Sequence, residues 1–155
     1  MNDLRVITLG GKRGGVTIVD AADFKELNRF KWTQHKRGYV VRKAVRMHRK
    51  ILIAPDGIEV DHRNHCLNDN TRRNLRLVTH LQNGYNQSKR RTVTSSRFKG
   101  IHWGKQHGKW FARISVNGSR KFIGLFADEV QAAIAYNKAA RKHHGEFASL
   151  NPVDG

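Results

Sequence analysis

An alternating run that ends in an Asn-Gly pair most restricts how this chain can fold. Apolar side chains recur at every second position from Trp110 to Val116, and side chains with a period of two lie on opposite faces of a β-strand. Asn117-Gly118 follows directly, and this dipeptide favours the tight turn of a hairpin. A returning strand is therefore expected over 120–126, in an antiparallel sheet with one apolar face.

A helix follows this hairpin and completes a small folding unit. Residues 98–103 are a further candidate strand. Asp128, with Gln131 three residues on, has the spacing of a capping box, so a helix is expected to run to about His143 and stop at Gly145. Several alanines on this helix permit close approach to a sheet: Ala132, Ala133, Ala135, Ala139 and Ala140. Three strands packed on one helix form a minimal unit that can fold.

Short strands around one helix are expected from residue 1 to about 53. Val16 to Val19 is β-branched and follows a glycine-rich turn at 10–15. That turn does not continue into Gly-Lys-Ser/Thr, so a hairpin is favoured over a phosphate loop. Asp20 is a candidate N-cap for a helix over 21–29, and 39–41 is a further strand.

The middle of the chain predicts two strands around a polar loop, followed by a helix. Residues 58–60 form a short strand that ends at Asp61, and 75–78 alternate as a second strand. Thr79 and Gln82 have capping-box spacing for the helix. Residues 89–96 are basic and almost free of apolar side chains, which is typical of a linker.

We therefore predict an α+β chain in two parts. The first, 1–88, is β-rich and contains the two strands and helix at about 48–88. The second, 97–151, is a three-stranded antiparallel sheet packed on one helix.

The charge of the chain points to a polyanionic partner. Its formal net charge is +18, from 30 Lys and Arg against 12 Asp and Glu, and neutralising phosphates releases condensed counterions. A basic structural protein of a ribosome would share this charge.

Cys66 is the only cysteine, so neither a disulfide nor a cysteine-based zinc site is expected. No apolar run approaches the roughly 18 residues of a membrane span, and we expect a cytoplasmic location, in a bacterial or phage-infected host cell.

Asp61 and His62 are adjacent in the sequence and are the candidate catalytic residues. Asn74 lies 13 residues after Asp61, and Asn83 lies 22 residues after it. Adjacent residues on a strand face opposite sides, so Asp61 and His62 can serve one site only if the strand ends or bulges there. An acid, a base and amide oxygens suit metal-assisted attack on a phosphodiester.

The segment from His48 to Asn83 resembles the His-Asn-His (HNH) endonucleases of the homing-endonuclease-like group found in phages and introns. The resemblance implies a ββα-metal fold and one divalent metal ion. It implies that Asp61 and Asn83 bind the metal, that His62 is the general base and that Asn74 orients His62. The supporting positions that match are His48, Asp69 and Asn70. His65 and Cys66 stand where the family usually has Gly and Asn. An oxygen-only ligand set favours Mg²⁺ or Mn²⁺ over Zn²⁺.

Residues 97–151 resemble the AP2 DNA-binding domain, known from plant transcription factors and often fused to phage HNH nucleases. The match rests on Lys99-Gly100-Ile101-x-Trp103, Trp110-x-Ala112-x-Ile114, Ile123-Gly124-x-Phe126, the helix segment Gln131 to Ala140, and Asn151. The family docks its sheet in the major groove of DNA. Alternation places Arg120, Phe122 and Gly124 on the outer face with Phe111. The DNA-facing candidates are Lys99, His102, Lys105, Arg113, Ser115 and Arg120.

These patterns together predict a DNA-nicking HNH endonuclease that an AP2-type module targets to double-stranded DNA. One such site cuts one strand, and we expect a monomer with no protein or membrane partner. Two alternatives remain open at this point. The first is a non-catalytic DNA-binding regulator, and the second is a structural protein that binds RNA or the ribosome.

Overall fold

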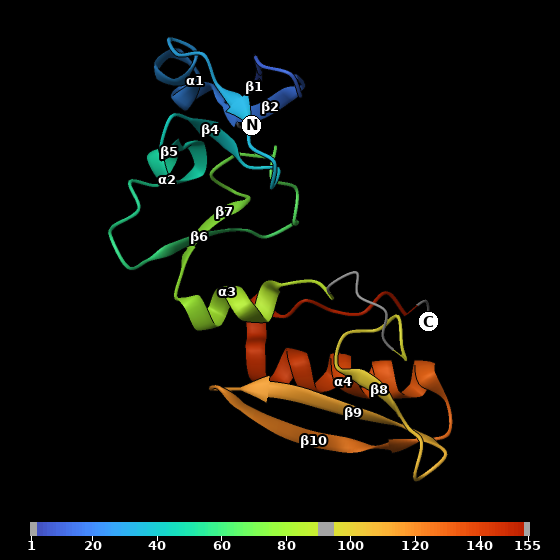
Figure 1. Cartoon of the computed structure of the whole chain (residues 1–155). Helices are drawn as coiled ribbons and strands as arrows, with labels where there is room; N and C mark the ends of the chain where they lie inside the picture. Colours follow the sequence, from blue (N-terminus) through green and yellow to red (C-terminus); the bar gives the residue numbers. More distant parts are fainter. Residues whose placement is uncertain (1–2, 90–94, 154–155) are drawn as a thin grey trace. The chain divides into compact units, whose positions relative to one another are not determined.

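The computed structural model of the chain describes residues 3–89 and 95–153 (Figure 1). The chain divides into two compact units, residues 1–80 and residues 81–155. Both combine helices with small antiparallel sheets, so the predicted α+β class is confirmed. The predicted linker at 89–96 falls largely outside the described residues. Within the described ranges, no helix is long and apolar enough to cross a lipid bilayer.

The first unit contains three small sheets and two short helices. Its elements are β1 (Leu4–Thr8), β2 (Val16–Asp20), α1 (Ala21–Leu27), β3 (Thr33–Gln34), β4 (Val40–Arg42), β5 (Val45–Arg46), α2 (Met47–Ile51), β6 (Glu59–His62) and β7 (Leu75–Val78). Strand β1 pairs with β2, β3 to β5 form a meander, and β6 pairs with β7. The expected hairpin at 10–15 is confirmed, because that turn joins β1 to β2.

One apolar cluster holds the first unit together. Ile7 of β1, Val19 of β2, Leu27 of α1 and Met47 of α2 are almost completely buried in it, around Trp32. The indole nitrogen of Trp32 donates to the backbone oxygen of Leu27 at 2.8 Å, so its one polar atom is satisfied inside the core.

The loop between β6 and β7 is tied to the edge of β2 by main-chain hydrogen bonds. The amide of Ile18 donates to the oxygen of Asn68 at 2.9 Å, and the amide of Asn70 donates to the oxygen of Ile18 at 2.8 Å. Asp20 accepts from the amide of Arg72 at 2.7 Å. Asp20 is the N-cap residue of α1, as predicted, but its carboxylate binds this loop and makes no cap hydrogen bond.

Helix α2 is an element that the sequence patterns did not predict, since its five residues are too short to show a helical period. It ends in a Schellman motif. The amide of Ala54 donates to the oxygen of Arg49 at 3.0 Å, and the amide of Ile53 donates to the oxygen of Lys50 at 3.3 Å. This motif requires a left-handed residue after the cap, and Ile53 has φ 49°. Glycine is the usual residue there, because a β-branched side chain is strained in that conformation.

The second unit is a three-stranded sheet with one long helix against it. Its elements are α3 (His80–Asn86, of which His80 belongs to the first unit), β8 (Ile101–Gly104), β9 (Lys109–Val116), β10 (Ser119–Phe126), α4 (Glu129–His144) and a 3-10 turn (Gly145–Phe147). The strand order is β10-β9-β8. Asp128 accepts from the amide of Gln131 at 2.8 Å, which confirms the predicted cap of α4.

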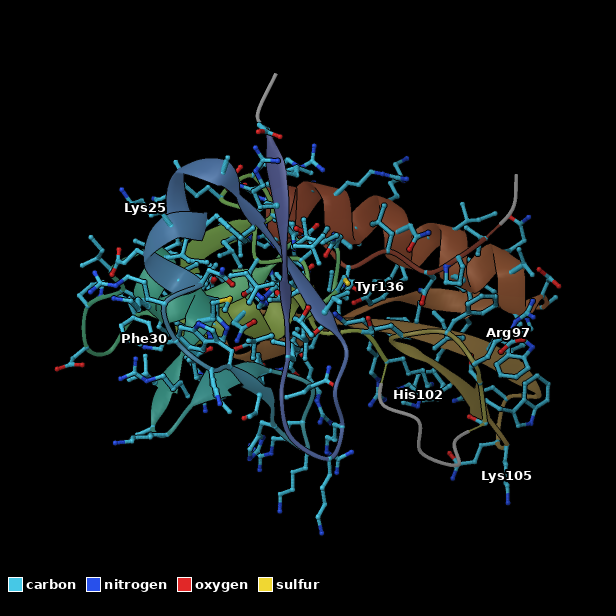
Figure 2. All side chains as sticks on the ribbon, turned by 90° about the horizontal axis from the view of Figure 1, so that it is seen from above. Lys25, Phe30, Arg97, His102, Lys105 and Tyr136 are labelled. Atoms are coloured by element: carbon cyan, nitrogen blue, oxygen red, sulfur yellow. The ribbon has the colours of Figure 1, made fainter. Side chains whose placement is uncertain are left out.

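Small residues bring α4 close to the inner face of this sheet. Ala132, Ala133 and Ala140 are completely buried against it. Tyr136 of α4 (labelled in Figure 2) lies over Gly100, where a Cβ would come within 2.3 Å of its ring. Gly100 also has φ +76°, so no other residue fits at that position without strain.

The register between β9 and β10 corrects one sequence-based assignment. Arg120 pairs with Ser115 and lies on the outer face as predicted, but the register shifts between Phe122 and Gly124. Gly124 consequently pairs with Ala112 of the inner face. The bulge adds a residue that strict alternation does not anticipate, so Gly124 is not on the outer face.

Replacing Ile53 with Gly should stabilise the first unit. We expect Ile53→Gly to raise its free energy of unfolding by about 1 kcal/mol, because glycine adopts the left-handed backbone without strain. Urea denaturation of the purified protein measures this. Lys50→Gly, inside the last turn of α2, should change stability in the opposite direction. A loss of stability in Ile53→Gly would contradict the strain.

Candidate functional site

A buried ion pair joins the two strands of the β6–β7 hairpin. Asp61 lies opposite Arg76 in the antiparallel register. Nε and Nη2 of Arg76 donate to Oδ2 of Asp61 at 2.9 and 2.8 Å, and both side chains are less than 10% exposed. The guanidinium therefore compensates the charge of a carboxylate that burial would otherwise penalise.

His62 is the last residue of β6, next to Asp61 and 3% exposed. The strand therefore ends at His62, which is the condition under which Asp61 and His62 can serve one site. Burial lowers the pKa of His62, and the bond to Asn70 and the charges of Asp61 and Asp69 oppose this effect. The ring is therefore neutral at neutral pH, which a proton acceptor needs.

Asn70 holds the ring of His62. Its Oδ1 lies 3.3 Å from Nε2 of His62, while its Nδ2 donates to the hydroxyl of Thr17 at 2.8 Å and to the backbone oxygen of Leu67 at 3.2 Å. A backbone oxygen only accepts, so this contact identifies the nitrogen end of the amide and directs the oxygen to His62. Nε2 of His62 therefore donates in its contact with Asn70.

Asn74 has a different place from the one predicted. Its Oδ1 accepts from the amide of Asn64 at 3.0 Å, and its Nδ2 donates to the backbone oxygen of Asp69 at 2.7 Å. The Asp69 carboxylate binds Nδ2 of Asn64 at 2.8 Å and the hydroxyl of Thr71 at 2.7 Å. Asn74 and Asp69 therefore shape the loop, and the side chain bonded to the ring of His62 is Asn70. His65, in the same loop, has φ 61°, a conformation that suits the glycine usual in the family.

A second buried histidine lies against the first. The ring centres of His48 and His62 are 5.2 Å apart and nearly perpendicular, and Tyr39 lies 5.2 Å from His48 and 6.3 Å from His62. Burial, followed by the charges of His62, Arg46 and Arg49, lowers the pKa of His48 to about 3. Its Nδ1 is buried without a hydrogen-bond partner. His48 is thus a neutral neighbour of His62, and Tyr39 is a site residue that no sequence pattern indicated.

The predicted metal ligands come from different units. Asp61 lies on β6 and Asn83 on α3 in the second unit, so their pairing stays a prediction. Among the described residues, no group of three or more His, Cys, Asp or Glu side chains is arranged to hold a metal ion. A site built from one carboxylate and one amide would consist of hard oxygen donors, which fit Mg²⁺.

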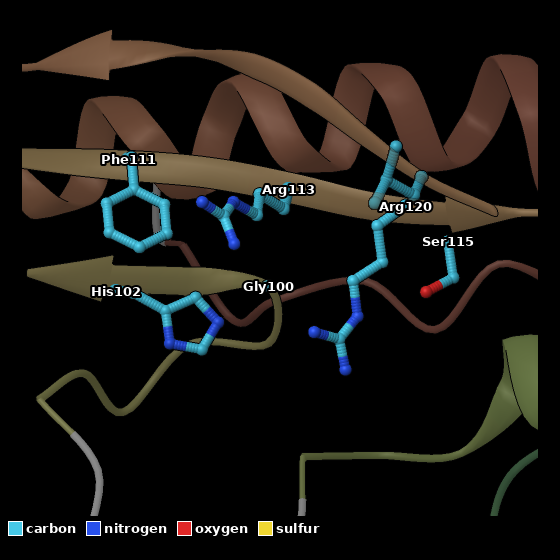
Figure 3. A pocket seen from close by; sticks show the side chains of 7 residues that line it. Gly100, His102, Phe111, Arg113, Ser115 and Arg120 are labelled. Atoms are coloured by element: carbon cyan, nitrogen blue, oxygen red, sulfur yellow. The ribbon is translucent and has the colours of Figure 1, made fainter.

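The outer face of the second unit carries a basic hollow of about 230 Å³. Figure 3 shows Arg113 and Arg120 projecting over it beside His102, whose ring stacks on Phe111 with centres 5.3 Å apart. Ser115 lines the same hollow. Burial, followed by the charges of Lys89, Arg113 and Arg120, lowers the pKa of His102. Four of the predicted DNA-facing residues are therefore gathered at one place: His102, Arg113, Ser115 and Arg120.

The other two candidates of this unit have separate positions. Lys105 lines a neighbouring hollow with Phe122, which is 63% exposed. Lys99 is directed elsewhere, because its Nζ donates to the backbone oxygens of Tyr85 and Gln87 at 2.7 and 2.6 Å. Burial lowers its pKa to about 8. Lys99 therefore ties α3 and the residue after it to the rest of the second unit, away from the hollow, and a DNA contact of Lys99 stays a prediction.

The geometry of the site and the similarity to known proteins point to the same class of protein. A buried imidazole beside an arginine-paired carboxylate on a two-stranded hairpin suits hydrolysis by general-base catalysis. An uncharacterized HNH endonuclease of Acanthamoeba polyphaga mimivirus is 34% identical over 155 residues, which covers 94% of this chain and 80% of that protein. The chain belongs to the HNH endonuclease family.

Plant proteins match a smaller part of the chain. The dehydration-responsive element-binding protein 2D of Arabidopsis thaliana is 41% identical over 59 residues, covering 37% of this chain and 28% of that protein. An AP2/ERF and B3 domain-containing protein of Oryza sativa subsp. japonica is 40% identical over 57 residues, covering 37% and 15%. No family model matches the chain. No solved structure matches it either.

Removing the arginine of the buried pair should destabilise the first unit strongly. We expect Arg76→Met to cost about 3–5 kcal/mol of unfolding free energy in urea denaturation, because Asp61 is left buried without its partner. Arg72→Met is the matched control, since Arg72 pairs with Asp23 while half exposed and should cost at most about 1 kcal/mol. Equal losses in the two variants would contradict a special role for the buried pair.

Proposed function

We propose that this protein is a metal-dependent endonuclease that hydrolyses DNA phosphodiester bonds, one strand at a time. The observation that carries the proposal is the held, neutral imidazole of His62 beside the Asp61–Arg76 pair, in a chain of the HNH endonuclease family. The basic outer face of the second unit supports DNA as the substrate.

His62 is the proposed general base. Its neutral ring accepts the proton of a water molecule whose oxygen attacks phosphorus. The bond from phosphorus to the 3′ oxygen breaks, which leaves a 5′-phosphate and a 3′-hydroxyl. The fixed amide of Asn70 holds the ring of His62 in one orientation.

Asp61 and Asn83 are the residues that would hold a divalent ion, Mg²⁺ or Mn²⁺. When bound, such an ion would supply positive charge to stabilise the transition state and the leaving oxygen. Two protein oxygens are a small ligand set for a hard cation. Phosphate oxygens of the substrate would complete it, and Arg76 would keep the Asp61 carboxylate in place.

The second unit is proposed to bind duplex DNA in the manner of an AP2 domain. Arg113 and Arg120 present guanidinium groups that match guanine edges or phosphates. Phe111 and Phe122 lie among these charges on the outer face, where a purely solvated surface would not place aromatic rings. The plant relatives that match the chain support this role, because their names include an element-binding protein and AP2/ERF domains.

The His62→Ala variant should lose cleavage and keep binding. We expect the purified wild-type protein to convert supercoiled plasmid to the open-circular form with Mg²⁺, and not with EDTA. His62→Ala should reduce this rate at least a hundredfold, because the general base is gone, while its DNA affinity in gel shifts changes less than threefold. His65→Ala, an exposed histidine of the same loop, is the matched control and should cleave normally. Absence of metal-dependent nicking by the wild type would instead favour a non-catalytic DNA-binding regulator.

Variants of the outer face should show the opposite behaviour. Arg113→Ala and Arg120→Ala are each expected to weaken DNA binding severalfold. Where the arginine neutralises a phosphate, its removal should also reduce the slope of log K against log salt by about 1. Fluorescence anisotropy at several salt concentrations measures both quantities. Arg141→Ala on α4 lies off this face and should leave the slope unchanged. A slope that is the same in all three variants would contradict binding through the sheet.

A further inference from the structure

Ile53 combines two unfavourable features, a strained backbone and an exposed apolar side chain. It occupies the left-handed position of the Schellman motif with φ 49°, where glycine is free of strain. Its side chain is also 87% exposed. Single exposed apolar residues are common on protein surfaces, but this one is strained as well and gains no burial in return. The Schellman motif needs the left-handed backbone but not an isoleucine, so the strain is a reason to look for a role in binding.

The surface beside Ile53 is apolar in its floor and basic at its rim. Ile53 lies at the edge of a hollow of about 500 Å³, which is lined by Phe30, Trp32, Arg42, Val45, Arg49, Lys50 and Ala54. Val45 is 47% exposed. The guanidinium of Arg42 lies 3.9 Å from the ring centre of Phe30 (labelled in Figure 2), and Lys50 pairs with Glu26. Arg42 thus presents a cation beside an apolar floor.

The loop that carries Ile53 is held rigidly to the strand of the candidate site. Arg49 donates to the backbone oxygens of Ile58 at 2.6 Å, Ala54 at 3.1 Å and Pro55 at 3.0 Å. These three bonds fix the segment between α2 and β6, and β6 carries Asp61 and His62. A group that Ile53 engages is therefore held in a fixed relation to the proposed catalytic strand.

We propose that Ile53 is an apolar wedge that inserts between adjacent base pairs of duplex DNA and partly unstacks them. Apolar side chains that enter from the minor groove act in this way in other DNA-binding proteins. Charge favours DNA as the occupant, because residues 1–80 contain 17 Lys and Arg against 8 Asp and Glu. The apolar floor would receive the sugar edge beside the wedge, and Arg42 would face a phosphate. This inference rests on the proposed function and identifies a contact of the nuclease unit itself.

A topoisomerase relaxation assay tests the wedge without cleavage and without a known target sequence. The full-length protein is bound to closed-circular plasmid in EDTA, a type I topoisomerase that needs no divalent metal relaxes the DNA, and the topoisomers are separated after the protein is removed. Insertion untwists DNA, so the wild type should lower the mean linking number in proportion to the protein bound. Ile53→Gly should lose at least two thirds of this shift per bound molecule, and Ile53→Met should retain most of it.

Val6→Ala is the matched control, because Val6 is an apolar residue of the same unit that is 57% exposed on a regular strand. It should leave the shift unchanged. A full shift with Ile53→Gly, or no shift with the wild type, overturns the wedge. The Mg²⁺ nicking assay on the same preparations separates the two proposals. A wild type that nicks without untwisting overturns the wedge alone, and one that untwists without nicking overturns the catalytic function alone.

Discussion

The attachment of the β6–β7 loop to the edge of β2 is the constraint on which the candidate site depends. Residues about fifty positions apart are joined by main-chain hydrogen bonds between Ile18 and the Asn68–Asn70 segment, and Thr17 adds a side-chain bond to each end of it. The loop is mostly polar and cannot be held by apolar burial alone, so these bonds determine its shape. They fix Asn70, and Asn70 fixes the ring of His62. The proposed general base at the end of β6 is thereby positioned by the N-terminal hairpin.

Burial affects the Asp61 carboxylate and the imidazoles of His62 and His48 differently, because their partners differ. Asp61 is buried with a guanidinium that bonds to it twice, so its charge is compensated inside the protein. Burial lowers the pKa of His62, and the bond to Asn70 and the charges of Asp61 and Asp69 oppose this effect. His48 has less compensation still, and its pKa falls to about 3. The same low-dielectric region therefore holds a compensated carboxylate beside neutral imidazoles, which is a suitable division between holding a cation and accepting a proton.

The second unit shows how one sheet serves two purposes. Its inner face is closed by the alanines of α4 and by the contact of Tyr136 with Gly100. Among the described residues of the second unit, no helix packs on the outer face, which carries arginines beside aromatic rings. The bulge after Phe122 returns Leu125 to the outer face opposite Phe111. Apolar and cationic groups consequently lie side by side on the outer face.

Local patterns of the sequence determined most elements. Alternation predicted β7 and β9, the Asn117-Gly118 turn predicted the last hairpin, and Asp128 and Gly145 predicted both ends of α4, because strand period, turn type and helix caps depend on neighbouring residues. The motif spacing also indicated Asp61 and His62 as candidate site residues. Only the tertiary structure decided which asparagine holds His62, that Arg76 pairs with Asp61, that Asp20 binds a distant loop and that Lys99 faces inward. Each of these contacts joins residues from different segments of the chain or from two paired strands. The sequence shows which side chains can donate or accept a hydrogen bond, but only the folded structure determines which of them meet.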